Sequence, residues 1–538
     1  MEPTRTEPAA PPAAPPAAPA PRPGRHAAPG QGAAGRQLAL RWAGPGAVTL
    51  LGGLLRFWNL GSPPKLMFDE TYYVKDAYSL LTRGVEFNWT KDQDHLFEAG
   101  DFSALQDTGS YVVHPPVGKW LIACGMWLFG PDSPVGWRFS AALFGTAAVL
   151  VAILVGWRLL DCQALGLLAG LMVAVDGIGV VLSRTGLLDV FLMFFALLGF
   201  WFVLKDRAQM DRRLARRADR AGPGGPGLGM RWYLLGAGLA LGLACGVKWS
   251  GLFFLAAFGL TVVAWDAAAR RRAGLRLWLP AALLRDGVKA FLLLVPAALV
   301  VYTASWAGWL ATAGGYNRQW AKDNPGQGIG WLPEGLRSLA QYHQQAYGFH
   351  TSLTSDHSYK SNPALWLIQQ RSTSFFYEKE ATCGAEECSQ AVTALGNPLI
   401  WWLGAVALVV VVYNAIVWAD RRAWGILAGY IGGYLPWLFY AQRTIFTFYT
   451  VAFLPFVALA LAYAAGRVIG PPLLGRCDRG LPQARIDPPA AHRVAAITGV
   501  GVAVGAILVV SAFFWPIWSG QSVDFDFWRL HMWLPSWV

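Results

Sequence analysis

Ionisable side chains gather where apolar stretches of this sequence end. Two carboxylates, Asp69 and Glu70, follow the first apolar stretch, and basic or imidazole groups stand at comparable places further on: His114, Arg138, Lys248 and Arg443. Charges in or beside hydrocarbon are costly, so such positions favour a functional interpretation. The cations would suit a lipid phosphate and a neighbouring carboxylate would suit a general base. Together they indicate group transfer from a lipid carrier to an acceptor.

The same residues also have structural interpretations. Arg138 and Arg443 could extend to lipid headgroups, as long basic side chains near helix ends do. His114 precedes two prolines and could cap a turn. Asp189 lies in an apolar stretch shortly after Arg184, and we expect these two residues to form a structural ion pair.

The composition indicates an integral membrane protein. Of the 538 residues, 55% are hydrophobic and 14% are charged, whereas soluble proteins carry roughly 25% charged residues. A bilayer crossing takes roughly 20 apolar residues as a helix. About eleven stretches meet this requirement: 38–60, 134–157, 163–182, 186–204, 231–248, 250–266, 290–312, 398–418, 423–440, 445–464 and 494–516.

The connections between these stretches alternate between a basic and a less basic class. The basic class contains residues 1–37, 158–161, 205–230, 267–289, 420–422 and 465–493. Basic residues mark the cytoplasmic side of a membrane protein, so the formal net charge of +12 indicates topology rather than a nucleic-acid partner. The N-terminus is then predicted to be cytoplasmic and the C-terminus extracytoplasmic, and the ionisable residues named above lie near the outer face.

This topology predicts an all-α polytopic protein with two long outer loops. The expected parts are a disordered cytoplasmic tail (1–37), a transmembrane module (38–312) with a first outer loop (61–133), a second outer loop (313–397), further transmembrane helices (398–516) and an outer tail (517–538). In the first loop, the short stretch WLIACGMWLFG is predicted to lie in the membrane interface.

Two of the six cysteines, Cys383 and Cys388, lie close together in a polar stretch of the second outer loop. They could form a local disulfide if this loop is exported to an oxidising compartment. A zinc pair is the other interpretation, but no second ligand pair lies nearby. No cluster of His and Cys has zinc spacing, so we expect no obligatory metal.

A series of motifs resembles the protein O-mannosyltransferase family, whose members are lipid-carrier-dependent glycosyltransferases of the C type (GT-C). The segment FDETYYVKDAYSLL at 68–81 resembles the first-loop motif of that family. Further segments follow the family's order along the chain: RFWNLGSP (56–63), HPPVGKWLI (114–122), WRFSAALFGT (137–146), SRTGLLDVFLMFF (183–195), GVKWSGLF (246–253) and HSYKSNPALW (357–366). YLPWLFY (434–440) and MWLPSWV (532–538) resemble the actinobacterial branch.

The resemblance implies a GT-C fold and an inverting mannosyltransferase of the plasma membrane. The implied donor is polyprenyl-phosphate mannose, and the implied acceptor is a Ser or Thr hydroxyl of a polypeptide at the Sec translocon, with membrane lipids as the surroundings. Asp69 is implied as the catalytic base and Glu70 as a positioning residue. The remaining site residues form two sets, phosphate-binding Arg138, Lys248 and Arg443, and sugar- or acceptor-binding Tyr72, Tyr73 and His114. No cofactor is implied.

The sequence departs from the eukaryotic members of the family in the second outer loop. Residues 313–397 are too few for the inserted β-trefoil (MIR) domain of those members, and the His-Pro-Tyr of the family stands here as His357-Ser358-Tyr359. Two alternatives stay open. One is a related GT-C enzyme with another sugar or a lipid acceptor, and the other is a transporter, which predicts charges near the midplane and broken helices in two related halves.

Overall fold

The computed structural model describes residues 31–217, 222–379, 382–470 and 490–538. Met1–Ala43 and Gly44–Val538 are two separate units. Apart from residues 31–43, which begin the first helix, the features below belong to the second unit. Most of the tail predicted to be disordered lies outside the described residues, as do parts of the connections predicted at 205–230 and 465–493.

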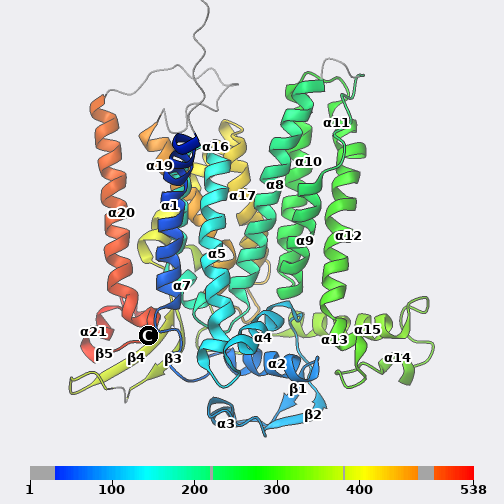
Figure 1. The fold of residues 1–538 in the computed structure, drawn as a ribbon, viewed down its shortest axis with the longest axis vertical. Coiled ribbons are helices and arrows are strands. Elements are labelled where there is room, and N and C mark those ends of the chain that lie inside the picture. Colours follow the sequence, from blue (N-terminus) through cyan, green and yellow to red (C-terminus); the bar gives the residue numbers. More distant parts are fainter. Residues whose placement is uncertain (1–30, 218–221, 380–381, 471–489) are drawn as a thin grey trace, which may run out of the picture. The chain divides into compact units, whose positions relative to one another are not determined.

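Each stretch predicted to cross the membrane is helical in the structure (Figure 1). The helices are α1 (Gln31–Phe57), α5 (Pro134–Leu160), α6 (Gln163–Val175) with α7 (Gly177–Ser183), α8 (Asp189–Arg217), α9 (Trp232–Val247), α10 (Gly251–Arg272), α12 (Val288–Ser305) with α13 (Ala307–Ala311), α16 (Pro398–Val417), α17 (Arg421–Gly433) with α18 (Leu435–Leu438), η4 (Thr447–Phe453) with α19 (Leu454–Ile469), and α20 (Ala490–Ser519). Among the described residues, 6 helices are long and apolar enough to cross a membrane, or 7 if the bent pair α6–α7 forms one span. The protein is therefore a multi-pass membrane protein, and the count of eleven crossings stays a prediction.

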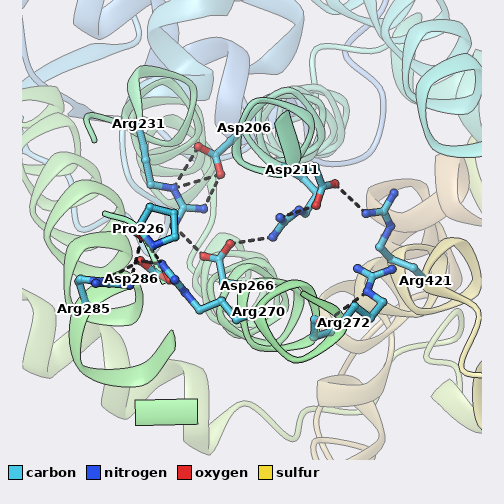
Figure 2. A network of polar contacts seen from close by, with 12 residues as sticks. Asp206, Asp211, Pro226, Arg231, Asp266, Arg270, Arg272, Arg285, Asp286 and Arg421 are labelled. Carbon is cyan, nitrogen blue, oxygen red and sulfur yellow. Dashed lines mark hydrogen bonds and ion pairs between the residues drawn. The ribbon is translucent and has the colours of Figure 1, made fainter. Parts of the chain in front are cut away.

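Helix α8 is longer than predicted, because buried ion pairs neutralise the charges in its second half. The sequence placed the end of this helix at 204, but it continues to Arg217. Asp206 pairs with Arg231, and Asp266 accepts from both Arg207 and Arg231 at 2.7 Å. Figure 2 shows how carboxylates and guanidinium groups from α8, α10 and the start of α9 meet in this network. Segment 205–217 is therefore part of the helix bundle rather than a loop.

The α6–α7 pair is bent by 61° at Asp176, and other side chains bind the backbone groups that the break leaves free. Arg56 donates to the carbonyl oxygens of Val173 and Ala174 at 3.0 and 3.1 Å, and the hydroxyl of Ser511 donates to that of the next residue, Val175, at 2.8 Å. The Asp176 carboxylate caps α7 by accepting from a backbone N–H in the first turn at 3.1 Å. Because buried backbone groups need partners, these contacts make the break a stable feature.

The two outer loops and the C-terminal segment lie at one end of the helices in Figure 1. The first outer loop forms α2 (Glu70–Arg83), α3 (Asp94–Glu98), α4 (Val117–Phe129) and the hairpin of β1 (Phe87–Trp89) and β2 (Leu105–Gly109). The second forms α14 (Trp320–Asp323), α15 (Glu334–Ser352), η3 (Pro363–Ile368), β3 (Thr373–Glu378) and β4 (Cys388–Ala394). The stretch WLIACGMWLFG (120–130), which the sequence placed in the membrane interface, forms most of α4. At the other end of the helices, α11 (Trp278–Pro280) and η2 (Ala281–Gly287) precede α12.

The C-terminal segment joins the second outer loop in one antiparallel sheet. It forms β5 (Ser522–Asp524), α21 (Phe525–Leu530) and η5 (Pro535–Trp537), and the strand order is β3–β4–β5. Cys383 and Cys388, the pair singled out in the sequence, are joined by a disulfide at the start of β4. Residues far apart in the sequence thus build one support beside the start of α2.

Candidate active site

Asp69 stands directly before α2, and aromatic packing fixes the residue that precedes it. Phe68 has a φ of 50°, in the left-handed region that bulky residues rarely adopt. Its ring stacks on Phe375 of β3 at 4.8 Å and meets Phe446 and Phe448 edge-on at 5.8 and 5.7 Å. The second outer loop and η4 therefore hold the backbone conformation that orients Asp69.

The surroundings of Asp69 adjust its affinity for a proton. Its side chain is partly buried, and the Tyr73 hydroxyl donates to Oδ2 at 3.5 Å. Burial raises the pKa of Asp69 to about 6, and the charge of Lys248 opposes that rise. A base is most effective when its pKa lies near the operating pH. Asp69 is thus ionised near neutral pH and still able to hold a proton.

Glu70 has no free acceptor position for a catalytic proton. Its two oxygens accept from Nε and Nη2 of Arg138, both at 2.9 Å. The backbone N–H groups of Gly186 and Met67 donate to the same carboxylate at 2.6 and 2.9 Å. This fully buried carboxylate ties the first turn of α2, next to Asp69, to α5 and to the chain just before α8.

The sequence grouped Arg138 with Lys248 and Arg443 as phosphate-binding cations, but Arg138 does not lie in the cavity that those two residues line. Besides Glu70, its guanidinium binds the carbonyl oxygens of Leu60, Pro63 and Lys65 at 3.3, 2.9 and 2.8 Å. It is fully buried and does not line the cavity next to Asp69. Because its donors are committed to the protein, Arg138 organises the start of the first outer loop.

A cavity of about 250 Å³ lies between α8, α10, α15, α17 and η4. Its polar lining includes His114, Asp189, Lys248, His350, Arg443 and Tyr449. Apolar side chains, among them Leu252, Phe253 and Trp437, complete the wall. A cationic centre with apolar walls fits an anionic headgroup that carries a lipid chain.

Lys248 enters this cavity at the point where α9 ends. Its Nζ donates to Oδ2 of Asp189, the first residue of α8, at 2.7 Å, and it lies 4.9 Å from the centre of the Tyr449 ring. The predicted pair between Arg184 and Asp189 is therefore wrong. Arg184 instead donates to backbone carbonyls after α1, with Trp58 among them, and to that of Ser519, which ties these segments together. Asp189 belongs to the site because it holds a cavity cation.

Arg443 reaches the cavity from the connection between α18 and η4. One nitrogen of its guanidinium, Nη2, donates to Nδ1 of His350 at 2.8 Å. His350 lies on α15 in the second outer loop, and its Nε2 lies 2.9 Å from the carbonyl oxygen of Val113. The two outer loops and the helix bundle therefore meet at this guanidinium.

Comparison with known proteins assigns the chain to a family. The family model described as "Dolichyl-phosphate-mannose-protein mannosyltransferase" matches residues 46–312, and "C-terminal four TMM region of protein-O-mannosyltransferase" matches residues 336–537. The chain belongs to the protein O-mannosyltransferase family. This membership excludes the transporter interpretation.

Three bacterial relatives bear the name polyprenol-phosphate-mannose–protein mannosyltransferase. The protein of Mycolicibacterium smegmatis (strain MKD8) is 34% identical over 520 residues, which cover 92% of this chain and 93% of the relative. The protein of Mycobacterium tuberculosis (strain H37Rv) is 33% identical, with 92% of both chains covered. The protein of Corynebacterium glutamicum is 31% identical, with 91% of both covered.

Two solved structures share the fold. The Saccharomyces cerevisiae protein O-mannosyltransferase Pmt1-Pmt2 complex bound to the sugar donor matches with a TM-score of 0.66 at 14% identity, covering 94% of both chains. The oligosaccharyltransferase AglB of Archaeoglobus fulgidus matches with a TM-score of 0.51 at 13% identity, covering 92% of this chain and 58% of AglB. The GT-C fold predicted from the sequence is confirmed.

The structure brings most of the predicted site residues of this family member to one place. Tyr73 and His114 face each other with ring centroids 6.0 Å apart, and Tyr73 contacts Asp69. Tyr72 is 66% exposed and lies outside the cavity lining. The cavity lining also leaves out Asp69, Glu70, Tyr73, Arg138 and Arg184, and Asp69 is linked to the cavity through Tyr73 and the charge of Lys248. Within the described ranges, no group of three or more His, Cys, Asp or Glu residues could hold a metal ion.

Sequence reasoning missed His350 and Tyr449. A signal for His350 did exist, since His343 and His350 lie two turns apart on α15 and so share one face of that helix. Both rings pack against Trp249, with centroids at 5.6 and 5.4 Å. Tyr449 carried no such signal, because it lies in a run of aromatic residues that reads as an ordinary buried segment.

Proposed function

We propose that this protein transfers mannose from polyprenyl-phosphate mannose to Ser and Thr hydroxyls of proteins at the outer face of the plasma membrane. The names of relatives that match over nine-tenths of both chains support the donor and the protein acceptor. The observation that carries the proposal is the position of Asp69, a partly buried carboxylate beside a cavity that holds Lys248 and Arg443.

The proposed reaction is a single displacement. Asp69 takes the proton of the acceptor hydroxyl as its oxygen bonds to the anomeric carbon. The bond between that carbon and the phosphate oxygen breaks, and its electron pair stays on the phosphate. Lys248 and Arg443 stabilise the negative charge that grows there. The anomeric centre inverts, and the products are a mannosylated side chain and polyprenyl phosphate.

Within this proposal, the other polar groups of the site have supporting roles. Tyr73 contacts Asp69 and lies next to His114, which lines the cavity, so these two side chains would meet the sugar or the acceptor. Glu70 and Arg138 fix the first turn of α2. A positioned phosphate is already a competent leaving group, so no acid partner and no cofactor is required.

The proposed orientation places the cavity outside the cell and the N-terminus in the cytoplasm. Arg231 and Arg270, together with the acidic partners shown in Figure 2, lie at the ends of α9 and α10 opposite to Lys248 and Ser250. Basic residues favour the cytoplasmic side, so the cavity end faces outward. Acceptors emerging from the Sec translocon would meet Asp69 there.

The decisive experiment uses purified protein, polyprenyl-phosphate mannose and a Thr-rich peptide. Asp69→Asn should retain donor binding and lose transfer by roughly a hundredfold or more, as expected for a general base. Asp107→Asn, at an exposed carboxylate of the same loop, is the matched control and should transfer normally. Near-normal transfer by Asp69→Asn would remove Asp69 as the base. A lipid acceptor used in preference to the peptide would favour the related lipid-modifying enzyme.

A further inference from the structure

The two cations of the cavity have partners of different charge. Lys248 is paired with a carboxylate, Asp189, whereas Arg443 is paired with an imidazole, His350. A carboxylate orients a cation and also cancels its charge, while a neutral acceptor orients the cation and leaves its charge available. The partner of each cation therefore decides how strongly it can attract an anion.

The hydrogen bonds of His350 fix its protonation state. A guanidinium only donates hydrogen bonds, so Nδ1 of His350 must accept from Arg443 and carries no proton. The proton of the neutral ring is then on Nε2, which donates to the carbonyl oxygen of Val113 at 2.9 Å. Burial lowers the pKa of His350 to about 4, so the ring stays neutral at physiological pH. His350 is thus a fixed acceptor held by the first outer loop.

The charges of the described residues that line the cavity add up to one unpaired positive charge. Lys248 and Asp189 cancel each other, and burial together with the nearby cations lowers the pKa of His114 well below its usual value. Among the described lining residues, Arg443 is then the cation whose charge no partner cancels. A phosphodiester carries one negative charge, which matches this arrangement.

We propose that His350 is a positioning residue for the donor, whose neutral ring aims Arg443 at the donor phosphate without cancelling its charge. This inference rests on the proposed function of the cavity. His350 acts through Arg443 and needs no contact with the donor. The same ring links α15 to the turn before α4, so the second outer loop takes part in building the phosphate site.

A purely structural role for His350 makes a different prediction. Its ring also packs against Trp249 at 5.4 Å and His114 at 5.4 Å, and a packing residue would be sensitive to size rather than to charge. Asn and Asp have nearly the same shape and both can accept from Arg443. They differ in charge alone, so this pair of substitutions separates the two roles.

The experiment compares His350→Asn, His350→Asp and His350→Leu in the purified full-length protein. His350→Asn keeps a neutral acceptor near the position of Nδ1, and its donor KM should stay within about threefold of the wild-type value. His350→Asp cancels the charge of Arg443 and should raise donor KM about tenfold or more, the loss expected for one charge-assisted hydrogen bond. His350→Leu removes the acceptor and should raise donor KM as well. Acceptor KM should stay unchanged in all three variants.

Two outcomes would overturn the inference. Equal donor KM for the Asn and Asp variants, whether normal or raised, would reduce His350 to a packing residue. A rise in acceptor KM with unchanged donor KM would place His350 at the acceptor instead. Melting temperatures of the three variants identify any that lose activity by unfolding.

Direct binding separates this inference from the proposed function. Polyprenyl phosphate binding to detergent-solubilised protein can be followed by thermal shift without any transfer reaction. Weaker binding by His350→Asp than by His350→Asn would support the role of His350 even if the wild-type protein failed to mannosylate the peptide. Equal binding by these two variants in a protein that does transfer mannose would refute the inference and leave the function intact.

Discussion

Two adjacent carboxylates at this site differ in the number of hydrogen bonds that they accept. Asp69 and Glu70 are adjacent in the sequence, yet Asp69 has one weak side-chain contact and Glu70 accepts four hydrogen bonds. The oxygens of Glu70 are occupied by donors, whereas burial raises the pKa of Asp69 to about 6, so Asp69 can exchange a proton near neutral pH. The surroundings, rather than the residue type, distinguish the proposed base from its neighbour.

The pH dependence of transfer should report the ionisation of Asp69. Its pKa is raised to about 6, and the ionised form is the active one, so the rate should be level above about pH 7. Below pH 6 it should fall about tenfold per pH unit as the carboxylate becomes protonated. We expect this acidic limb in kcat/KM with peptide as the varied substrate.

The variant Lys248→Met provides the control for that assignment. Lys248 lowers the pKa of Asp69, so its removal should move the acidic limb of the profile to higher pH when donor is saturating. A limb that stays at the same pH in this variant would show that another group controls the rate.

Arg138 should contribute to stability rather than to donor affinity. Arg138→Met leaves the buried Glu70 carboxylate without its bidentate partner, a loss of about 3–5 kcal/mol in the free energy of unfolding. The double variant Arg138→Met/Glu70→Gln removes the unpaired charge and should recover part of that loss. Thermal unfolding measures both effects. A stable Arg138→Met variant with a raised donor KM would instead return Arg138 to the phosphate site.

At the scale of elements, α8, α9 and α10 carry polar groups at both ends and apolar side chains between them. Asp189 and Lys248 meet at the cavity end, and Asp206, Arg231 and Asp266 meet at the other end (Figure 2). Because the buried charges are paired across three helices, each pair fixes how the helices lie along one another. The network far from the cavity thus supports the position of Lys248 within it.

The variant Asp266→Asn tests whether the network far from the cavity contributes to stability rather than to donor binding. Asp266 accepts from Arg207 and Arg231, both at 2.7 Å, and its neutralisation leaves two buried guanidinium groups undercompensated. We expect a loss of about 3–5 kcal/mol in stability with an unchanged donor KM in the folded fraction. The opposite pattern, an unchanged melting temperature with a raised donor KM, would contradict a purely structural role for the network.

Helices were predictable from the sequence, but the contacts of the site were predictable only in part. Length and hydropathy located the bundle helices of the cavity wall, because a lipid-exposed helix must be apolar along its length. They did not locate α15, which also lines the cavity but lies in the second outer loop and is not uniformly apolar. The predicted end of α8 was wrong because the ion pairs that join it to other helices cannot be seen in the sequence of α8 alone. For the same reason the sequence grouped Arg138 with Lys248, since both are basic residues at helix ends. Their partners, Glu70 and Asp189, are set by tertiary packing alone.

At the scale of the whole protein, the C-terminal segment is connected to Asp69 through a chain of packed elements. Strand β5 pairs with β4, β4 pairs with β3, and Phe375 of β3 stacks on Phe68, which precedes Asp69. Trp537 fixes the end of the segment: its Nε1 donates to the carbonyl oxygen of Gln369 at 2.7 Å, and its own carbonyl accepts from Ser372 at 3.0 Å. The segment 522–537 is therefore part of the support for Asp69, the proposed base.

Removal of residues 522–538 should accordingly impair catalysis from a distance. The truncation exposes one edge of β4 and removes the buried Trp537, so β3 should lose order and Phe68 should lose its stacking partner. We expect kcat to fall by roughly tenfold, the price of a misplaced base, with a smaller change in donor KM because Lys248 and Arg443 keep their partners. Trp537→Ala is the milder variant and should cost about 3–5 kcal/mol of local stability. Hydrogen exchange at residues 373–378 measures the loss of order directly, and normal protection there together with full activity in the truncated protein would contradict this long-range support.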